Sequence, residues 1–479
     1  MAPKGYHRGE IAEGEMLTAS RPLSRVRLLH AHAGPLAFLT LIAFAVVWIG
    51  THAWRPVEPH LVRGLPRAVS GDEPHYLVIV HSLLFDHDLA LDDDYRAVAR
   101  GGPEAGSRFA GASLDPHTRL VAHDGSASIL WYELYNLNRP LPEPSDAHGF
   151  RFAAKTPNPL VPGSYVQVPA HPPAYAAMLA ALIGPSGPAP GDVERMVGIV
   201  TVSIAVATLF AAYVAGVVAA LTPRESAAAV ALFALCSPWL FYSKSMFTEA
   251  AAALLLLPAA IAHLRGRAAI AGAFLGAAMW MKPYYALAGC AWIVQRLFEH
   301  RFRDAAVLTG VLAAAAAGLI AFNCTYASTP LVSGARPVTF TFSPISGIGN
   351  WLFGPKFGLL VFAPWVAAIA AFTWFVPKEA RVAVRALAWT CLLQLAFLAL
   401  IAPTDGGSGY GPRYMAQLMP WLSMLAVLAL RSRTRAFSMA FATLAFVSLL
   451  MTVPSALQYE DYSYWARPPH LPLKKWITG

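Results

Sequence analysis

The residues best suited to chemistry form a short polar run, 70–77, in a chain that is otherwise strongly apolar. In this run Asp72 and Glu73 stand directly before a proline. Proline favours the first turn of a helix and carboxylates favour its positive end, so a helix is predicted to begin here. The two acids could serve only to cap this helix. Alternatively, one of them could act as a general base at a membrane surface while the other binds a substrate or a metal ion. Asp72 is the candidate base, and the candidates for positioning a substrate or a metal ion here are Glu73, His75 and Tyr76.

A second set of charged residues stands alone at the predicted outer ends of apolar segments: Glu249, Lys282, Lys356 and Arg413. A charge at a membrane edge can simply reach to the interface, but charges at such positions usually face a cavity and a partner. Converging cations suit an anionic group such as a phosphate, which Arg413 can bind with two hydrogen bonds and Lys282 as a point charge. Glu249 joins the candidates for positioning a substrate or a metal ion.

Two further signals are weaker. His171 opens an apolar segment, and histidine can act as acid, base, metal ligand or phosphate donor, although a plain turn explains it equally well. The acids between Asp86 and Asp94 resemble a cation site in composition. Their spacing lacks the glycine and the terminal glutamate of an EF-hand loop, so a solvated turn with helix caps is the favoured interpretation.

The composition shows what kind of protein carries these residues. The chain has 479 residues, of which 56% are hydrophobic and only 13% charged. Soluble domains have about 25% charged residues, so this chain has too few to cover a soluble body of its size. A single soluble enzyme and a disordered chain are therefore excluded, and a polytopic membrane protein remains. The net charge of +9 does not indicate nucleic-acid binding, because the basic residues cluster in short loops between apolar runs.

We expect an all-α membrane protein with about eleven transmembrane helices. They are predicted at 35–54, 196–221, 225–242, 246–263, 268–282, 284–298, 305–325, 357–376, 385–402, 413–430 and 435–456. The corresponding regions are an N-terminal tail (1–33), the first helix (34–54), a large loop with interfacial helices (55–195), a ten-helix region (196–456) and a C-terminal tail (457–479). Residues 171–183 are apolar but too short to span, which indicates an interfacial or re-entrant helix.

The charges of the short loops predict the orientation of these helices. With the N-terminus in the cytoplasm, the cytoplasmic loops hold twelve basic residues: Arg224, Arg265, Arg267, Arg296, Arg301, Arg303, Lys378, Arg381, Arg385, Arg431, Arg433 and Arg435. The opposite short loops hold five: Lys244, Lys282, Arg336, Lys356 and Arg413. This bias favours a cytoplasmic N-terminus, and it places the large loop and the candidate site residues outside.

The order of these motifs resembles the GT-C integral-membrane glycosyltransferases, in particular bacterial relatives of protein O-mannosyltransferases and of the lipid A aminoarabinose transferase. The residues that carry the resemblance are Asp72-Glu73, His171-Pro172-Pro173, Phe247-Thr248-Glu249, Met281-Lys282-Pro283, Lys356-Phe357-Gly358-Leu359-Leu360 and Gly411-Pro412-Arg413-Tyr414. Some members of the family have Lys-Pro-Pro where this chain has His171, Pro172 and Pro173.

The resemblance implies transfer of a sugar from a polyprenyl-phosphate carrier to an acceptor hydroxyl of a glycan, lipid or protein, with inversion. Asp72 would be the base, and Lys282 and Arg413, with Lys356 and His171 as further candidates, would bind the donor phosphate. Some relatives use a divalent cation (Mg, Mn or Zn) and others are not known to need one, so no metal ligand is assigned. The implied location is the bacterial cytoplasmic membrane, with the site facing the periplasm or the outside.

Two alternatives compete with a transferase. A transporter or flippase for a lipid-linked glycan intermediate would also need a cationic cavity, but it should show broken helices near mid-membrane. An assembly factor without chemistry would not need Asp72, Lys282 and Arg413 to converge. The polar residues gather at one predicted face only, which favours surface chemistry.

Overall fold

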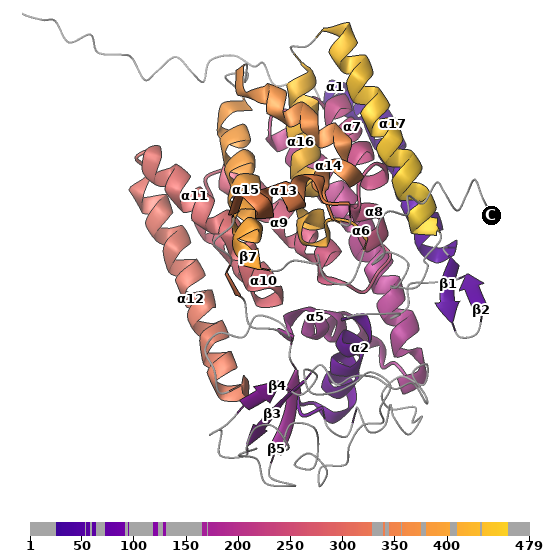
Figure 1. The fold of residues 1–479 in the computed structure, drawn as a ribbon, viewed down its shortest axis with the longest axis vertical. Coiled ribbons are helices and arrows are strands. Elements are labelled where there is room, and N and C mark those ends of the chain that lie inside the picture. The colour runs from indigo at the N-terminus through magenta and orange to yellow at the C-terminus, as the bar shows by residue number, and fades with distance from the viewer. Residues whose placement is uncertain are drawn as a thin grey trace, which may run out of the picture.

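A computed structural model describes the fold over most of the chain. The described residues are 25–52, 54–57, 60–63, 72–91, 94, 118–122, 128–130, 165–169, 171–327, 339–340, 344–355, 357–374, 380–402, 410–431 and 434–457. Most of them lie in a helical bundle, and a smaller part lies at one end of it (Figure 1).

Six helices of the described part are long and apolar enough to cross a membrane. They are α1 (Arg25–His52), α6 (Val193–Val218), α12 (Phe302–Ala327), α15 (Arg381–Leu400), α17 (Arg435–Leu457) and the consecutive pair η10 (Arg413–Leu418) and α16 (Met419–Leu430). The apolar window of α17 is only 17% buried, whereas that of η10 and α16 is 89% buried. The first therefore presents its apolar side chains to lipid and the second lies inside the bundle, as expected for a multi-pass membrane protein.

Shorter helices complete the bundle. They are α7 (Pro223–Leu235), α8 (Trp239–Tyr242), α9 (Thr248–Leu264), α10 (Ala268–Met281), η7 (Pro283–Ala286), α11 (Leu287–Phe298), α13 (Pro344–Phe353), α14 (Leu359–Phe362) and η8 (Pro364–Trp374). Two of the predicted helices are broken. The predicted helix 225–242 is interrupted before Pro238, and the predicted helix 357–376 is interrupted before Pro364, because proline lacks the N–H that continues the helical hydrogen bonds. The total of eleven spans stays a prediction.

The polar region after α1 contributes both helices and strands. It contains β1 (Trp54–Val57), β2 (His60–Arg63), α2 (Glu73–His81), η1 (Ser82–Asp86), β3 (Thr118–Ala122), β4 (Ser128–Leu130), β5 (Tyr165–Pro169), α5 (Ala174–Ile183), η5 (Gly184–Ser186) and η6 (Pro190–Asp192). β3 pairs with β4 and β5 in an antiparallel sheet, and β1 pairs with β2. A further short pair joins β6 (Thr339–Phe340) to β7 (Ile401–Ala402). The helices α2 and α5 lie where helices were expected, and their interfacial location stays a prediction. The strands differ from the all-α expectation.

α2 and α5 pack against each other at the end of the bundle, with the three-stranded sheet beyond them (Figure 1). All nine residues of α2 are buried. On α5, Tyr175, Leu179 and Ile183 are buried at a spacing of four, so one face of this short helix points into the protein. The segment 171–183 is thus an inward-packed helix, too short to cross a membrane.

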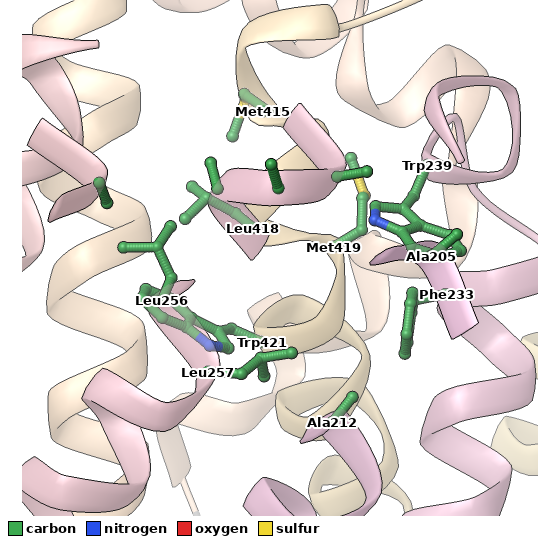
Figure 2. Packing of buried hydrophobic residues seen from close by; sticks show 14 of the residues in the cluster. Ala205, Ala212, Phe233, Trp239, Leu256, Leu257, Met415, Leu418, Met419 and Trp421 are labelled. Atoms are coloured by element: carbon green, nitrogen blue, oxygen red, sulfur yellow. The ribbon is translucent and has the colours of Figure 1, made fainter. Parts of the chain in front are cut away.

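The apolar core packs α8, α9 and α16 against one another. Figure 2 shows Trp239 and Trp421 among Leu256, Leu257 and Met419, all of them buried. These residues come from α8, α9 and α16, so the core holds the middle of α9 in place relative to α8 and α16. Close packing of this kind transmits a shift of one helix to its neighbours.

α10 and α12 approach closely, and glycine makes the approach possible. A Cβ atom at Gly276 would lie 2.9 Å from the Cβ of Ala315. Trp280 Nε1 also donates a 2.9 Å hydrogen bond to the carbonyl of Ala315. The contact matters beyond stability, because α10 ends at Met281 and Lys282 follows as its C-cap.

We expect Gly276→Ala to destabilise the protein by about 1–3 kcal/mol, because the new methyl group overpacks the contact with Ala315. Gly310→Ala is the matched control on α12, since a Cβ there has nothing within 4 Å. It should be neutral or stabilising by up to about 1 kcal/mol. Thermal unfolding in detergent measures both variants, and equal loss of stability in the two would contradict the packing argument.

Candidate active site

Five polar or charged side chains from distant segments meet where α2 and α5 join the bundle. Asp72 is the N-cap residue of α2 and His171 lies three residues before α5. Glu249 is in the first turn of α9, Lys282 is the C-cap residue of α10, and Arg413 begins η10. The convergence predicted from helix ends and a common side is therefore present among these five residues.

Four of them form an alternating chain of charges. Arg413 Nη2 lies 2.5 Å from Asp72 Oδ2, and Arg413 Nε donates to Glu249 Oε1 at 3.0 Å. Lys282 Nζ donates to the same Glu249 oxygen at 2.7 Å. The order of charges is thus negative, positive, negative, positive. Arg413 bridges two carboxylates, and Glu249 is shared by two cations. With all four side chains ionised, their charges sum to zero.

The two ends of this chain are more accessible than its middle. The exposed fraction is 20% for Asp72 and 13% for Lys282, against 2% for Arg413 and zero for Glu249. A partly exposed aspartate and a partly exposed lysine therefore flank a sealed pair of opposite charges. Breaking such a buried pair is costly, because the remaining charge loses its compensation.

Aromatic rings support the cations from the side. The guanidinium carbon of Arg413 lies 3.9 Å from the centre of the Phe247 ring. Lys282 Nζ lies 5.4 Å from the centre of the Tyr414 ring. Both distances fit cation–π contacts, which strengthen when water is excluded. No role was predicted for Phe247 and Tyr414, although Phe247 stands two residues before Glu249 and Tyr414 directly follows Arg413 in the sequence.

The Gly411-Pro412 pair before Arg413 has a structural reason. Gly411 has φ +61°, and a Cβ there would lie 3.0 Å from the ring of Phe362. Just before it, the Tyr410 carbonyl accepts a 2.8 Å hydrogen bond from the hydroxyl of Tyr242. The glycine therefore permits the turn that brings Arg413 under Asp72.

His171 and Tyr76 line the accessible end of the chain beside Asp72. His171 Nε2 lies 3.8 Å from Asp72 Oδ1, and the rings of His171 and Tyr76 are 5.5 Å apart. Burial lowers the pKa of His171 from its usual 6.5; nearby Asp72 opposes this effect, and Lys282 and Arg413 add to it. Burial also raises the pKa of Tyr76 well above its usual value, with Asp72 contributing in the same direction. Both side chains are therefore neutral near pH 7.

Glu73 and His75 point into the protein. Glu73 is fully buried, and its Oε1 accepts a 2.7 Å hydrogen bond from the backbone N–H of Met246. This bond ties α2 to the segment just before α9. His75 is buried as well, with 4% of its surface exposed. Their predicted role in positioning a substrate or a metal ion stays a prediction, and for Glu73 the contact with Met246 favours a structural role.

The described residues do not supply a ligand set for a metal ion. No group of three or more His, Cys, Asp or Glu side chains in this part of the chain could hold one. The nearest carboxylates, Asp72 and Glu249, already face cations. We therefore derive no chemical step through a metal.

Two of the predicted features fall partly or wholly outside the described residues. Lys356, a candidate phosphate ligand, lies outside them, as do Asp92 and Asp93 of the acidic cluster. Within that cluster, Asp88 Oδ1 accepts hydrogen bonds from Ser82 Oγ (3.2 Å) and from the backbone N–H of Ala90 (3.0 Å). This is the turn geometry that was favoured for the acids there.

Comparison with solved structures identifies the fold. The chain is similar to ArnT from Cupriavidus metallidurans, solved bound to undecaprenyl phosphate, with a TM-score of 0.54 and 13% identity over 91% of this chain and 68% of that one. An apo oligosaccharyltransferase from Archaeoglobus fulgidus matches with a TM-score of 0.46 and 12% identity, over 88% and 56% of the two chains. No protein-family model matches, and neither does any curated protein sequence. The chain thus has a fold of the GT-C type, as the resemblance of its motifs indicated.

The lowered pKa of His171 predicts how stability depends on pH. Below pH 6.5 the unfolded chain takes up a proton at this residue that the folded chain resists, so stability falls as the pH drops below 6.5. We expect His171→Gln to reduce this fall, measured as the unfolding temperature in detergent between pH 7.5 and 5. His52→Gln, at an exposed histidine at the end of α1, is the control. The same pH dependence in wild type and His171→Gln would refute the assignment.

Proposed function

We propose that this GT-C-type fold serves an inverting membrane glycosyltransferase, which moves a sugar from a polyprenyl-phosphate donor to the hydroxyl of a glycan, lipid or protein acceptor. One observation carries the proposal: a partly exposed aspartate, Asp72, and a partly exposed lysine, Lys282, are held at the two ends of one row of alternating charges. Inverting transfer needs such a pair, a base for the incoming oxygen and a cation for the departing phosphate.

Asp72 has the contacts expected of the base. Its Oδ2 is bound by Arg413, which favours the ionised carboxylate, and its Oδ1 faces neutral His171. In the proposed step Asp72 takes the proton of the acceptor hydroxyl while that oxygen forms a bond to the anomeric carbon. The bond from this carbon to the phosphate oxygen breaks, and its electron pair leaves with the polyprenyl phosphate.

Lys282 is the best-placed ligand for the departing phosphate. Among the two cations of the chain it is the more exposed, and an ammonium group can donate three hydrogen bonds. Arg413 is nearly sealed and bridges two carboxylates, so we assign it the task of holding Asp72 and Glu249 in place. A phosphate-binding role for Lys356 and His171 remains part of the expectation from the motifs.

Two further observations support a lipid-linked donor and a site at the outer face of a membrane. The likeness in fold is to a protein solved with undecaprenyl phosphate bound, which is a lipid carrier of the proposed class. The bias of basic residues in the short loops favours a site on the outer side of the membrane. We therefore propose that the protein works at the outer, periplasmic face of a bacterial cytoplasmic membrane.

Asp72→Asn tests the proposal. The amide keeps the shape but cannot accept the proton, so kcat should fall by about 10²–10⁴-fold with little change in the KM for the donor. The assay follows loss of labelled sugar from a panel of polyprenyl-phosphoryl sugars in proteoliposomes supplied with a cell-envelope extract. Asp88→Asn, the same change at an exposed acid, should keep wild-type turnover. Wild-type turnover by Asp72→Asn would refute the assignment of the base.

A further inference from the structure

Glu249 is a carboxylate that the proposed transfer step leaves without a task. It is fully buried, and Oε1 accepts hydrogen bonds from both Lys282 and Arg413. Its second oxygen, Oε2, is also buried and has no hydrogen-bond partner among the described residues. A carboxylate in the interior normally has both oxygens satisfied, so this half-satisfied group calls for an explanation.

Charge counting shows what a phosphate would do here. Because the four ionised groups already sum to zero, one added phosphodiester leaves one negative charge without compensation in a poorly solvated place. The cost of an uncompensated buried charge is several kcal/mol, and proteins commonly avoid it by taking up a proton. A carboxylate of the chain is the natural site for that proton.

Glu249 is better suited than Asp72 to take up the proton. Asp72 is partly solvated and has Arg413 at 2.5 Å, both of which favour its ionised form. Glu249 has no solvent contact, and it loses one of its two cations if Lys282 turns to a phosphate. A proton on Oε2 would still leave Oε1 free to accept the hydrogen bond of Arg413.

The groups facing Glu249 do not supply another proton acceptor. The cations are Lys282 from α10 and Arg413 from η10. The remaining titratable groups that sense its charge are tyrosines: Tyr76 on α2, Tyr175 on α5, and Tyr284 and Tyr285 on η7. Tyrosine is neutral at physiological pH and stays so when a negative charge is added. His171 also responds to Lys282, but it lies beside Asp72, so Glu249 is the group in direct contact with Lys282 that can take up a proton.

We propose that Glu249 is an exchangeable counterion: a phosphodiester displaces it from Lys282, and Glu249 takes up a proton in the same event. This inference rests on the proposed function, because it assumes that Lys282 binds the donor phosphate. Glu249 is accordingly a positioning residue that sets when Lys282 is available. Phosphate binding then weakens as the pH rises, by up to about tenfold per pH unit where one proton is taken up.

The test uses farnesyl methyl phosphate, a phosphodiester whose single charge does not titrate near neutral pH. Calorimetric titration of the full-length protein in detergent at pH 7 is carried out in two buffers of different ionisation enthalpy, PIPES and Tris. The difference in binding enthalpy gives the number of protons taken up. We expect about half to one proton for the wild type.

Glu249→Gln should abolish proton uptake, make the affinity independent of pH, and tighten binding by about tenfold, because Lys282 no longer has a charged competitor. Glu299→Gln is the matched control. Glu299 also pairs with a buried arginine, but it is the C-cap residue of α11, at the end of that helix away from Lys282. It should leave both affinity and proton uptake unchanged.

The outcomes separate the two proposals. Binding by the wild type without proton uptake would overturn the role of Glu249 and leave the transferase proposal standing, and this measurement needs no variant. Uptake of the same size in Glu249→Gln would overturn it as well. No saturable binding by either wild type or Glu249→Gln would overturn the proposed donor class, and the inference with it.

Discussion

The alternating chain Asp72, Arg413, Glu249 and Lys282 is the interaction on which the rest of the site depends. Moving an ion from water into a protein interior costs several kcal/mol, and only close, well-oriented opposite charges offset it. No member of the chain can therefore be moved alone. The first turns of α2 and α9, the end of α10 and the start of η10 must all meet at one place, and the surrounding packing has to hold them there.

The apolar scaffold supplies that packing through contacts that are specific to helix ends. The backbone N–H of Met246 binds Glu73 and so joins the start of α9 to α2. The hydroxyl of Tyr242 binds the carbonyl of Tyr410 and joins α8 to the turn before Arg413. Two of the site's helix ends are marked by proline: Pro283 directly follows Lys282, and Pro412 directly precedes Arg413.

The sequence predicted which residues converge better than how they pair. The lone charges at helix ends on one predicted side include Glu249, Lys282 and Arg413. Exposing such charges to lipid is costly, so they were expected to face a shared cavity. The alternation of signs was hidden, since Asp72 and Arg413 are 341 positions apart and pair only through tertiary packing. The inward turn of Glu73 was hidden too, because neighbouring residues of a helix point about 100° apart. The strands were missed because they are only two to five residues long.

The opposite end of the bundle argues for chemistry on one side rather than transport. There, His263 near the end of α9 stacks on Trp292 of α11 at 4.6 Å, and Arg296 donates to the carbonyl of His263. Arg296 also pairs with Glu299 at 2.8 Å at the same end of α11, while its bond to the His263 carbonyl joins α11 to α9. An alternating-access carrier needs comparable access from both sides. Here Asp72 and Lys282 lie at one end of α9 and the network around His263 lies at the other, an asymmetry that agrees with the proposed reaction at one face of the bundle.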